Sequence, residues 1–254
     1  MFKYVLFCVI ACASLSFADN YNPRLNNPSD LQHKSFDVFT LAQSWPIAAC
    51  WDLNSKWSHV NSPCSPCRRT ASKNWTLHGL WPSNLHGRHP AHCADRKNYA
   101  SAQMDINLRS ELQRKWPSHK LSMSDDSFWN YEWKKHGTCA SGHASTNSLK
   151  KYFNTAFKLL DEYNMGRIFE EANIHPGHDY EYSRIVQALS NALGVNGFFG
   201  CGKPSGSSDR QYLLEIYICF DTSFQLTDCN NKGGFLSSCN KKQKITYAKN
   251  IASC

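Results

Sequence analysis

Two segments of the chain place histidine beside residues suited to proton transfer and anion binding. In residues 128–139, Glu132, Lys135 and His136 are spaced i, i+3 and i+4, so in a helix they share one face. The second segment holds His78 in an alternating, strand-like run flanked by tryptophans. Each segment alone has an ordinary explanation, a solvated charged face for the first and a buried core histidine for the second.

Brought together, these four side chains have the parts needed for displacement at a phosphodiester. One neutral imidazole takes a proton, one imidazolium gives a proton, and a cation stabilises the charged phosphorane. The 2′-hydroxyl of RNA supplies an internal nucleophile. Because the two histidines must differ in protonation, we expect a bell-shaped dependence of activity on pH.

The surrounding sequence predicts the strands and helices that position these segments. Alternating or continuous apolar runs indicate strands, and apolar residues at helical spacing indicate helices. The predicted strands cover residues 36–41, 75–81 and 212–220, and the predicted helices are one ended by Pro117, one over residues 148–165 and one over residues 182–193, closed by Gly194. Because strands and helices do not alternate regularly, the fold class is α+β.

The composition is that of a globular protein. Of the 254 residues, 41% are hydrophobic, which is enough for a core and excludes disorder. The excess of 28 Lys and Arg over 20 Asp and Glu gives a net charge of +8. Such a charge fits an anionic partner and fits ordinary solubility equally well.

The N-terminus has the pattern of a secretory signal. Lys3 precedes an apolar stretch, and a small-x-small cleavage site ends at Ala18. A membrane anchor needs about 20 consecutive apolar residues, so we expect no anchor. We assign residues 1–18 to a signal peptide, 19–35 to a loose N-terminal arm and 36–254 to a single catalytic domain.

Cysteine content agrees with an oxidising compartment. Of 12 cysteines, Cys8 and Cys12 leave with the signal, and the rest can form disulfides, although spacing alone does not fix the pairing. Cys64 and Cys67 form a CxxC pair, but no second ligand pair supports zinc and no βαβ unit supports a redox motif. A single sequon at Asn74 predicts glycosylation. The predicted disulfide cysteines are Cys50, Cys64, Cys67, Cys93, Cys139, Cys201, Cys219, Cys229, Cys239 and Cys254.

The two histidine segments resemble the two active-site segments of the ribonuclease T2 family. They are Trp75-Thr76-Leu77-His78-Gly79-Leu80-Trp81-Pro82 and residues 128–139, and the resemblance extends from about residue 36 to residue 239. It implies a central antiparallel sheet packed with helices and several disulfides. It also implies a metal-independent endoribonuclease without a cofactor, secreted or routed to a lysosome or vacuole. Such an enzyme cleaves single-stranded RNA through a 2′,3′-cyclic phosphate at acidic pH, and we expect a monomer.

By position, the resemblance also implies roles for individual residues. His136 matches the general base, His78 the general acid, and Glu132 and Lys135 the pair that supports the phosphorane. Trp81 matches an aromatic residue on which a base stacks, a contact worth about 1–3 kcal/mol.

Three substrate-binding positions differ from the common family pattern. Tyr131 stands where many members have a third histidine that contacts phosphate, so we expect weaker phosphate binding without loss of the chemistry. Ser83 stands where some members have an acidic residue that helps to read the base. His89 falls near an aromatic position of the base site, and the base preference stays open.

The family pattern implies a partial set of bridges and leaves some pairings open. Cys50 joins either Cys64 or Cys67, and the remaining cysteine of those two pairs with Cys254. The other implied bridges are Cys93–Cys139, Cys201–Cys239 and Cys219–Cys229.

Two other functions and a metal site are alternatives to the enzyme. The chain could be a ribonuclease-fold recognition protein that acts on a receptor without turnover, or a secreted protein that binds polyanions by charge alone. The retained pair of histidines favours the enzyme. A metal site at His86, His89, His92 and Cys93 is disfavoured, because their loop matches ordinary positions of the family.

Overall fold

A computed structural model describes residues 35–49, 73–93, 104–120, 123–202, 210–229 and 238–250. The predicted signal peptide and all but the last residue of the predicted arm lie outside the described residues. So do Cys50, Cys64, Cys67 and Cys254. In the described ranges, no helix is long and apolar enough to cross a membrane.

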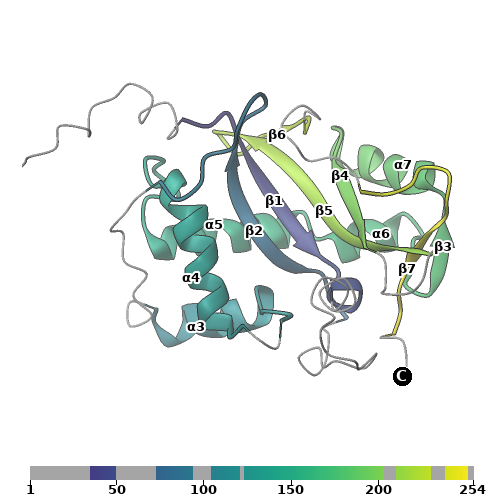
Figure 1. The fold of residues 1–254 in the computed structure, drawn as a ribbon, viewed down its shortest axis with the longest axis horizontal. Coiled ribbons are helices and arrows are strands. Elements are labelled where there is room, and N and C mark those ends of the chain that lie inside the picture. The colour runs from purple at the N-terminus through teal and green to yellow at the C-terminus, as the bar shows by residue number, and fades with distance from the viewer. Residues whose placement is uncertain are drawn as a thin grey trace, which may run out of the picture.

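One sheet organises the described chain, with strand order β2-β1-β5-β7-β3 and with β4 and β6 also paired to β5 (Figure 1). The pairs are antiparallel except for β5 and β7, which run parallel. The expected antiparallel arrangement is therefore confirmed for the centre of the sheet, and the parallel pairing of β7 with β5 makes the sheet mixed. The strands are β1 (Val38–Ser44), β2 (Thr76–Ser83), β3 (His178–Tyr180), β4 (Phe198–Gly202), β5 (Gln211–Asp221), β6 (Leu226–Thr227) and β7 (Ile245–Tyr247).

Helices pack against this sheet, which confirms the α+β class. Figure 1 shows α3 and α4 beside β2, and α6 and α7 at the opposite end of the sheet near β3 and β4. The helices are α3 (Ile106–Lys115), α4 (Asp125–Lys135), α5 (Leu149–Glu162), α6 (Met165–Glu171) and α7 (Tyr182–Leu193), and a 3-10 helix, η3 (Gly137–Ala140), follows α4. The predicted helix over residues 148–165 is thus α5, and its last residue begins α6.

Local sequence explains where these helices begin and end. The side chains of Asp105, Ser124 and Ser148 each accept a hydrogen bond from a backbone N–H of the first turn, in α3, α4 and α5 respectively. Gly194 ends α7 in the left-handed conformation with φ of 70°. Helix α5 buries the predicted apolar face, which includes Tyr152 and Phe153 at 0% exposure.

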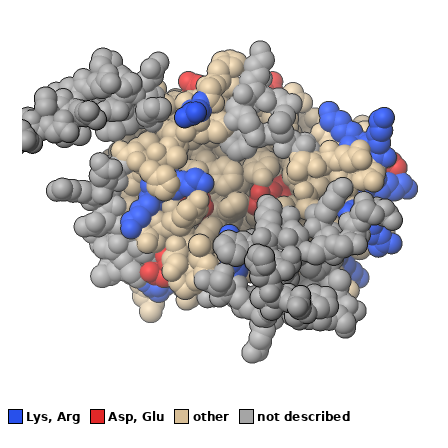
Figure 2. All heavy atoms as spheres, in the orientation of Figure 1, with Lys and Arg blue, Asp and Glu red and all other residues tan. Residues whose placement is uncertain are grey.

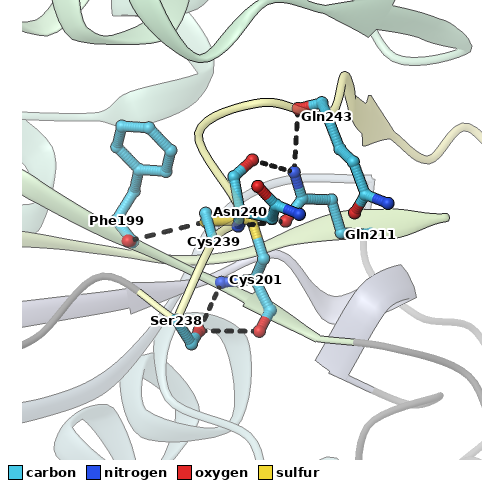
Figure 3. The surroundings of a disulfide bond; sticks show 7 residues. All are labelled: Phe199, Cys201, Gln211, Ser238, Cys239, Asn240 and Gln243. Atoms are coloured by element: carbon cyan, nitrogen blue, oxygen red, sulfur yellow. Dashed lines mark hydrogen bonds between the residues drawn. A yellow bond between two sulfur atoms is a disulfide. The ribbon is translucent and has the colours of Figure 1, made fainter. Parts of the chain in front are cut away.

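Three disulfides join segments that the resemblance pairs, Cys93–Cys139, Cys201–Cys239 and Cys219–Cys229. Figure 3 shows how the second is secured, since the Ser238 hydroxyl accepts from the Cys201 N–H at 2.8 Å and donates to the Cys201 carbonyl at 2.7 Å. These contacts fix β4 against the segment that leads into β7.

Candidate active site

A cleft of about 1370 Å³ brings the predicted residues together. His78 and Trp81 reach it from β2, Glu132 and Lys135 from α4, and His136 from the end of that helix. Tyr131, Ser83 and His89 also line it. Figure 2 shows this face of the molecule, where acidic and basic atoms lie across a hollow from each other. The two sequence segments therefore form one site.

Strand β2 presents His78 because its other side chains turn into the core. Within β2, His78 and Trp81 are half-buried and their neighbours are buried. The His78 carbonyl accepts a hydrogen bond from the Trp116 indole at 2.9 Å, and the imidazole lies 5.1 Å from the Trp81 ring. These contacts hold the backbone and the ring of His78 in one place.

The imidazole of His78 is paired with a carboxylate. Its Nδ1 lies 2.5 Å from Oε1 of Glu215, a residue of β5. Burial opposes the charged imidazolium, but the charge and hydrogen bond of Glu215 outweigh it and raise the pKa of His78 to about 9. His78 is therefore a cation at neutral pH and can donate a proton.

His136 has the opposite surroundings. Burial, followed by the positive charges of Lys135 and His78, lowers the pKa of His136 to about 2. Its buried Nδ1 has no hydrogen-bond partner among the described residues, and its ring lies 5.3 Å from the Trp81 ring. His136 is therefore neutral and can accept a proton.

Helix α4 ends beside a glycine. Its last residue is Lys135, and Gly137 begins η3. His136 is the residue between them, with its N–H donating to the Glu132 carbonyl at 2.9 Å. His136 lies at the junction between α4 and η3, so its side chain reaches the cleft from the end of α4.

Glu132 lies beneath Trp81. Its side chain is almost inaccessible, with 1% of the residue exposed, and Oε2 accepts a hydrogen bond from the Trp81 indole at 2.9 Å. Burial raises the pKa of the Glu132 carboxyl to about 7. Gly79 makes room for this contact, because a Cβ on it would come 2.7 Å from Glu132 Oε2 and would overlap the Trp81 indole.

Lys135 and Tyr131 form a polar pair at the rim of the cleft. The Lys135 ammonium donates to the Tyr131 hydroxyl at 2.9 Å and lies 5.2 Å from the centre of its ring. Tyr131 is 43% exposed. The tyrosine that replaces the common third histidine therefore offers a hydroxyl and an aromatic face beside a cation.

The three predicted base-contacting residues differ in how they meet the cleft. Trp81 packs against both imidazoles. His89 is half-buried, and its Nδ1 accepts from the Asn84 N–H at 3.0 Å. Ser83 is 1% exposed, accepts from Thr40 at 3.0 Å and donates to the Trp81 carbonyl at 3.1 Å. The Ser83 hydroxyl therefore joins β1 to β2, and a contact between Ser83 and the base stays a prediction.

Two charged or ionisable residues of the site were not singled out from the sequence. Glu215 is the one charged residue in the otherwise apolar run 212–220 of β5, and an acid in a buried strand is a signal that could have found it. His119 lines the cleft and lies 2.9 Å from the Thr76 hydroxyl through Nε2. Burial and then the charge of His78 lower the pKa of His119 to about 4. No spacing pattern points to His119.

The state of Cys93 is relevant to the disfavoured metal site at His86, His89, His92 and Cys93. Its sulfur is bonded to Cys139 and so is not a thiolate ligand. Within the described ranges, no group of three or more His, Cys, Asp or Glu residues is arranged to hold a metal ion.

Comparisons with known proteins identify the family of this chain. Residues 36–229 match the model of the Ribonuclease T2 family. The chain is 34% identical over 221 residues to "Ribonuclease Oy" of Magallana gigas, covering 84% of this chain and 97% of that protein. It is 33% identical over 192 residues to "Extracellular ribonuclease LE" of Solanum lycopersicum, covering 75% of this chain and 78% of that one.

Solved structures give the same result for the fold. Japanese pear S3-RNase superposes with a TM-score of 0.68 at 27% identity, covering 84% of this chain and 100% of that chain. Human RNase T2 superposes with a TM-score of 0.66 at 25% identity, covering 84% of this chain and 98% of that chain. The match over most of the chain, in sequence and in fold, shows that this protein belongs to the ribonuclease T2 family.

Proposed function

We propose that the protein is an endoribonuclease that cleaves single-stranded RNA by transphosphorylation. His136 removes the 2′-hydroxyl proton, and the oxygen attacks the adjacent phosphorus to form a 2′,3′-cyclic phosphate. The bond to the 5′-oxygen breaks, and His78 donates a proton to that oxygen. The observation that carries the proposal is the pair of imidazoles in one cleft with opposite surroundings, His78 against a carboxylate and His136 beside an ammonium.

The protonation states match this division of labour. The pKa of His136 is lowered to about 2 and that of His78 is raised to about 9. Between these values the base is neutral and the acid is charged, as the reaction requires. Two groups of one type with pKa values pushed apart by their environments are typical of an acid and base pair.

Glu132 and Lys135 act on the charge of the phosphate. The Lys135 ammonium at the rim offsets the charge that develops on the phosphorane. The carboxyl of Glu132, whose pKa is raised to about 7, is neutral in more acidic solution and does not repel the substrate. Above about pH 7 the Glu132 carboxyl becomes an anion next to the anionic phosphate of the substrate. We therefore expect an acidic optimum and a decline in rate above about pH 7.

The same site supports proposals on cofactors and location. Each proton transfer and each charge in the mechanism is handled by a side chain, so we propose that the reaction needs no metal. Asn74 is exposed, as a glycan acceptor must be. With the disulfides and the signal-like N-terminus, this supports export to the extracellular space or to an acidic organelle of the secretory pathway.

The test is cleavage of an end-labelled single-stranded RNA by the oxidised protein lacking residues 1–18, from acidic to alkaline pH with EDTA present. We expect products with 2′,3′-cyclic phosphate ends. His78→Ala and His136→Ala should each reduce the rate by about 10²–10⁴-fold. His175→Ala is the control, because this imidazole pairs with Glu170 at 3.1 Å and is not part of the cleft.

Three results would contradict the proposal. They are no cleavage by folded wild-type protein, a rate that is constant from acidic to alkaline pH, and loss of cleavage on chelation. The first would favour a receptor-binding role, and the last would restore the metal hypothesis.

A further inference from the structure

The floor of the cleft contains a carboxylate with an unusual number of protein partners. Glu215 on β5 is paired across the sheet with Ser44 of β1, and its side chain is 13% exposed. Oε1 lies 2.5 Å from Nδ1 of His78 and accepts from the Ser44 hydroxyl at 2.7 Å. Oε2 accepts from the Tyr217 hydroxyl. Three separate donors therefore hold this carboxylate in place.

These contacts show what Glu215 does and does not do. Both of its oxygens are engaged by the protein, so it is poorly suited to read a base or bind a ribose. Burial favours the neutral acid, but the charge of His78 and the bonds from His78, Tyr217 and Ser44 outweigh burial and lower the pKa of Glu215 to about 2. Glu215 is an anion whose effect on the reaction passes through His78.

Other charged groups also face His78, from different elements. Glu132 on α4 adds a second negative charge, while Lys120, in the segment between α3 and α4, opposes protonation of His78. His119, next to Lys120, and His136 are both influenced by the charge of His78. Among the described residues, Glu215 is the one that bonds directly to the His78 ring.

We infer that Glu215 is the positioning residue of the general acid: it binds Nδ1 of His78, so that Nε2 is the nitrogen left to protonate the leaving 5′-oxygen. The hydrogen bond at one ring nitrogen decides which tautomer and which proton the other nitrogen presents. Ser44 and Tyr217 fix the carboxylate, and the carboxylate fixes the ring. The inference rests on the proposed function, because it takes His78 to be the acid.

The variant Glu215→Gln tests the negative charge of the side chain separately from its size. The amide has nearly the same size, but it removes the anion that keeps His78 protonated. Without that anion, burial lowers the pKa of His78 from about 9 to below its ordinary value of 6.5, so the variant loses the protonated acid at a lower pH than the wild type does. At pH 7.5 the protonated fraction of His78 then falls at least about tenfold. The ratio of variant to wild-type kcat/KM should therefore decrease as the pH rises.

A second substrate tests whether the loss of activity in Glu215→Gln arises from the proposed general acid, His78. A nucleoside 3′-(4-nitrophenyl phosphate) has a leaving group that departs without protonation. We expect Glu215→Gln and His78→Ala to be impaired on RNA and much less impaired on this ester, whereas His136→Ala is impaired on both.

Glu170→Gln is the matched control, because Glu170 also pairs with a histidine, His175 at 3.1 Å, but on the exposed surface. It should behave as wild type on both substrates. Titration of the His78 ring by NMR in each variant gives a readout that does not depend on turnover. Its pKa should fall in Glu215→Gln, and in Tyr217→Phe by a smaller amount.

The outcomes are distinguishable. A ratio of kcat/KM that does not change with pH, equal losses on both substrates, or an unchanged NMR titration of His78 would each overturn the inference about Glu215. Retention of RNA cleavage by His136→Ala would instead overturn the proposed function. In that case the NMR titration would still decide whether Glu215 controls His78.

Discussion

Adding a single methyl group at Gly79 should strongly reduce the activity of the enzyme. In Gly79→Ala the new Cβ would lie 2.7 Å from Glu132 Oε2, whereas ordinary contacts begin at 3.4 Å, so this oxygen must move by about 0.7 Å. The Trp81 indole must move further, since the Cβ would overlap it. The change breaks the hydrogen bond between Trp81 and Glu132 and displaces the aromatic ring that packs against both proposed catalytic histidines.

The size of the effect follows from these displacements. Overpacking of a well-packed region costs about 1–3 kcal/mol, and leaving a buried carboxyl without its donor costs about 1–3 kcal/mol. A misplacement of about 1 Å in a catalytic group lowers the rate by on the order of 100-fold. We therefore expect kcat/KM to fall about 100-fold in a protein that still folds.

The assay is cleavage of labelled single-stranded RNA, with thermal unfolding measured on the same samples. Gly142→Ala is the matched control, because a Cβ on Gly142 meets nothing within 4 Å. It should keep wild-type activity and stability. Wild-type kcat/KM in Gly79→Ala would refute the reasoning, because it would mean that Trp81 and Glu132 are not held where the reaction needs them.

Further predictions concern the bridges and the rim of the cleft. Replacing Cys93 and Cys139 by serine opens a bridge with a sequence separation of 46 and should cost about 4 kcal/mol, against about 3 kcal/mol for Cys219 and Cys229 with a separation of 10. Scanning calorimetry should show the larger fall in Tm for the first pair, and equal falls would contradict the loop-closure argument. Tyr131→His adds an imidazole where a cation can meet phosphate, so KM for RNA at pH 5 should decrease with little change in kcat. Tyr131→Phe should not lower KM, and a lower KM in both variants would attribute the effect to loss of the hydroxyl.

The longer elements could be predicted from the sequence because their own periodicity specifies them. Helix α5 has an apolar stripe that repeats at helical spacing, and α7 has a glycine at its end. Strands β3 and β7 have three residues each and β6 has two. Such short strands exist because a neighbour pairs with them, so their own residues carry little local pattern, and the partners β3 and β7 are also distant in sequence. The parallel pairing of β7 with β5 belongs to this group.

The same distinction applies to the site. Two short motifs specify the four proposed catalytic residues, because each motif fixes its own spacing. Glu215 acts on His78 across a separation of 137 residues, and no motif connects them. Its role depends on the register between β1 and β5, which pairs Ser44 with Glu215. Register is a property of the assembled sheet, so the partner of the acid had to come from the structure.

Because β5 is central in the sheet and is synthesised late, the order of synthesis affects when the site can form. Ser44 and Glu215 are separated by 171 residues, which take on the order of 10–30 s to synthesise at about 5–20 residues per second. By the end of that interval both proposed catalytic histidines have been synthesised, but β1 still lacks its neighbour β5. When β5 has been synthesised, it can pair with β1, and it also supplies Glu215, the partner of His78. The centre of the sheet and the carboxylate partner of the proposed general acid therefore depend on the same late strand, β5.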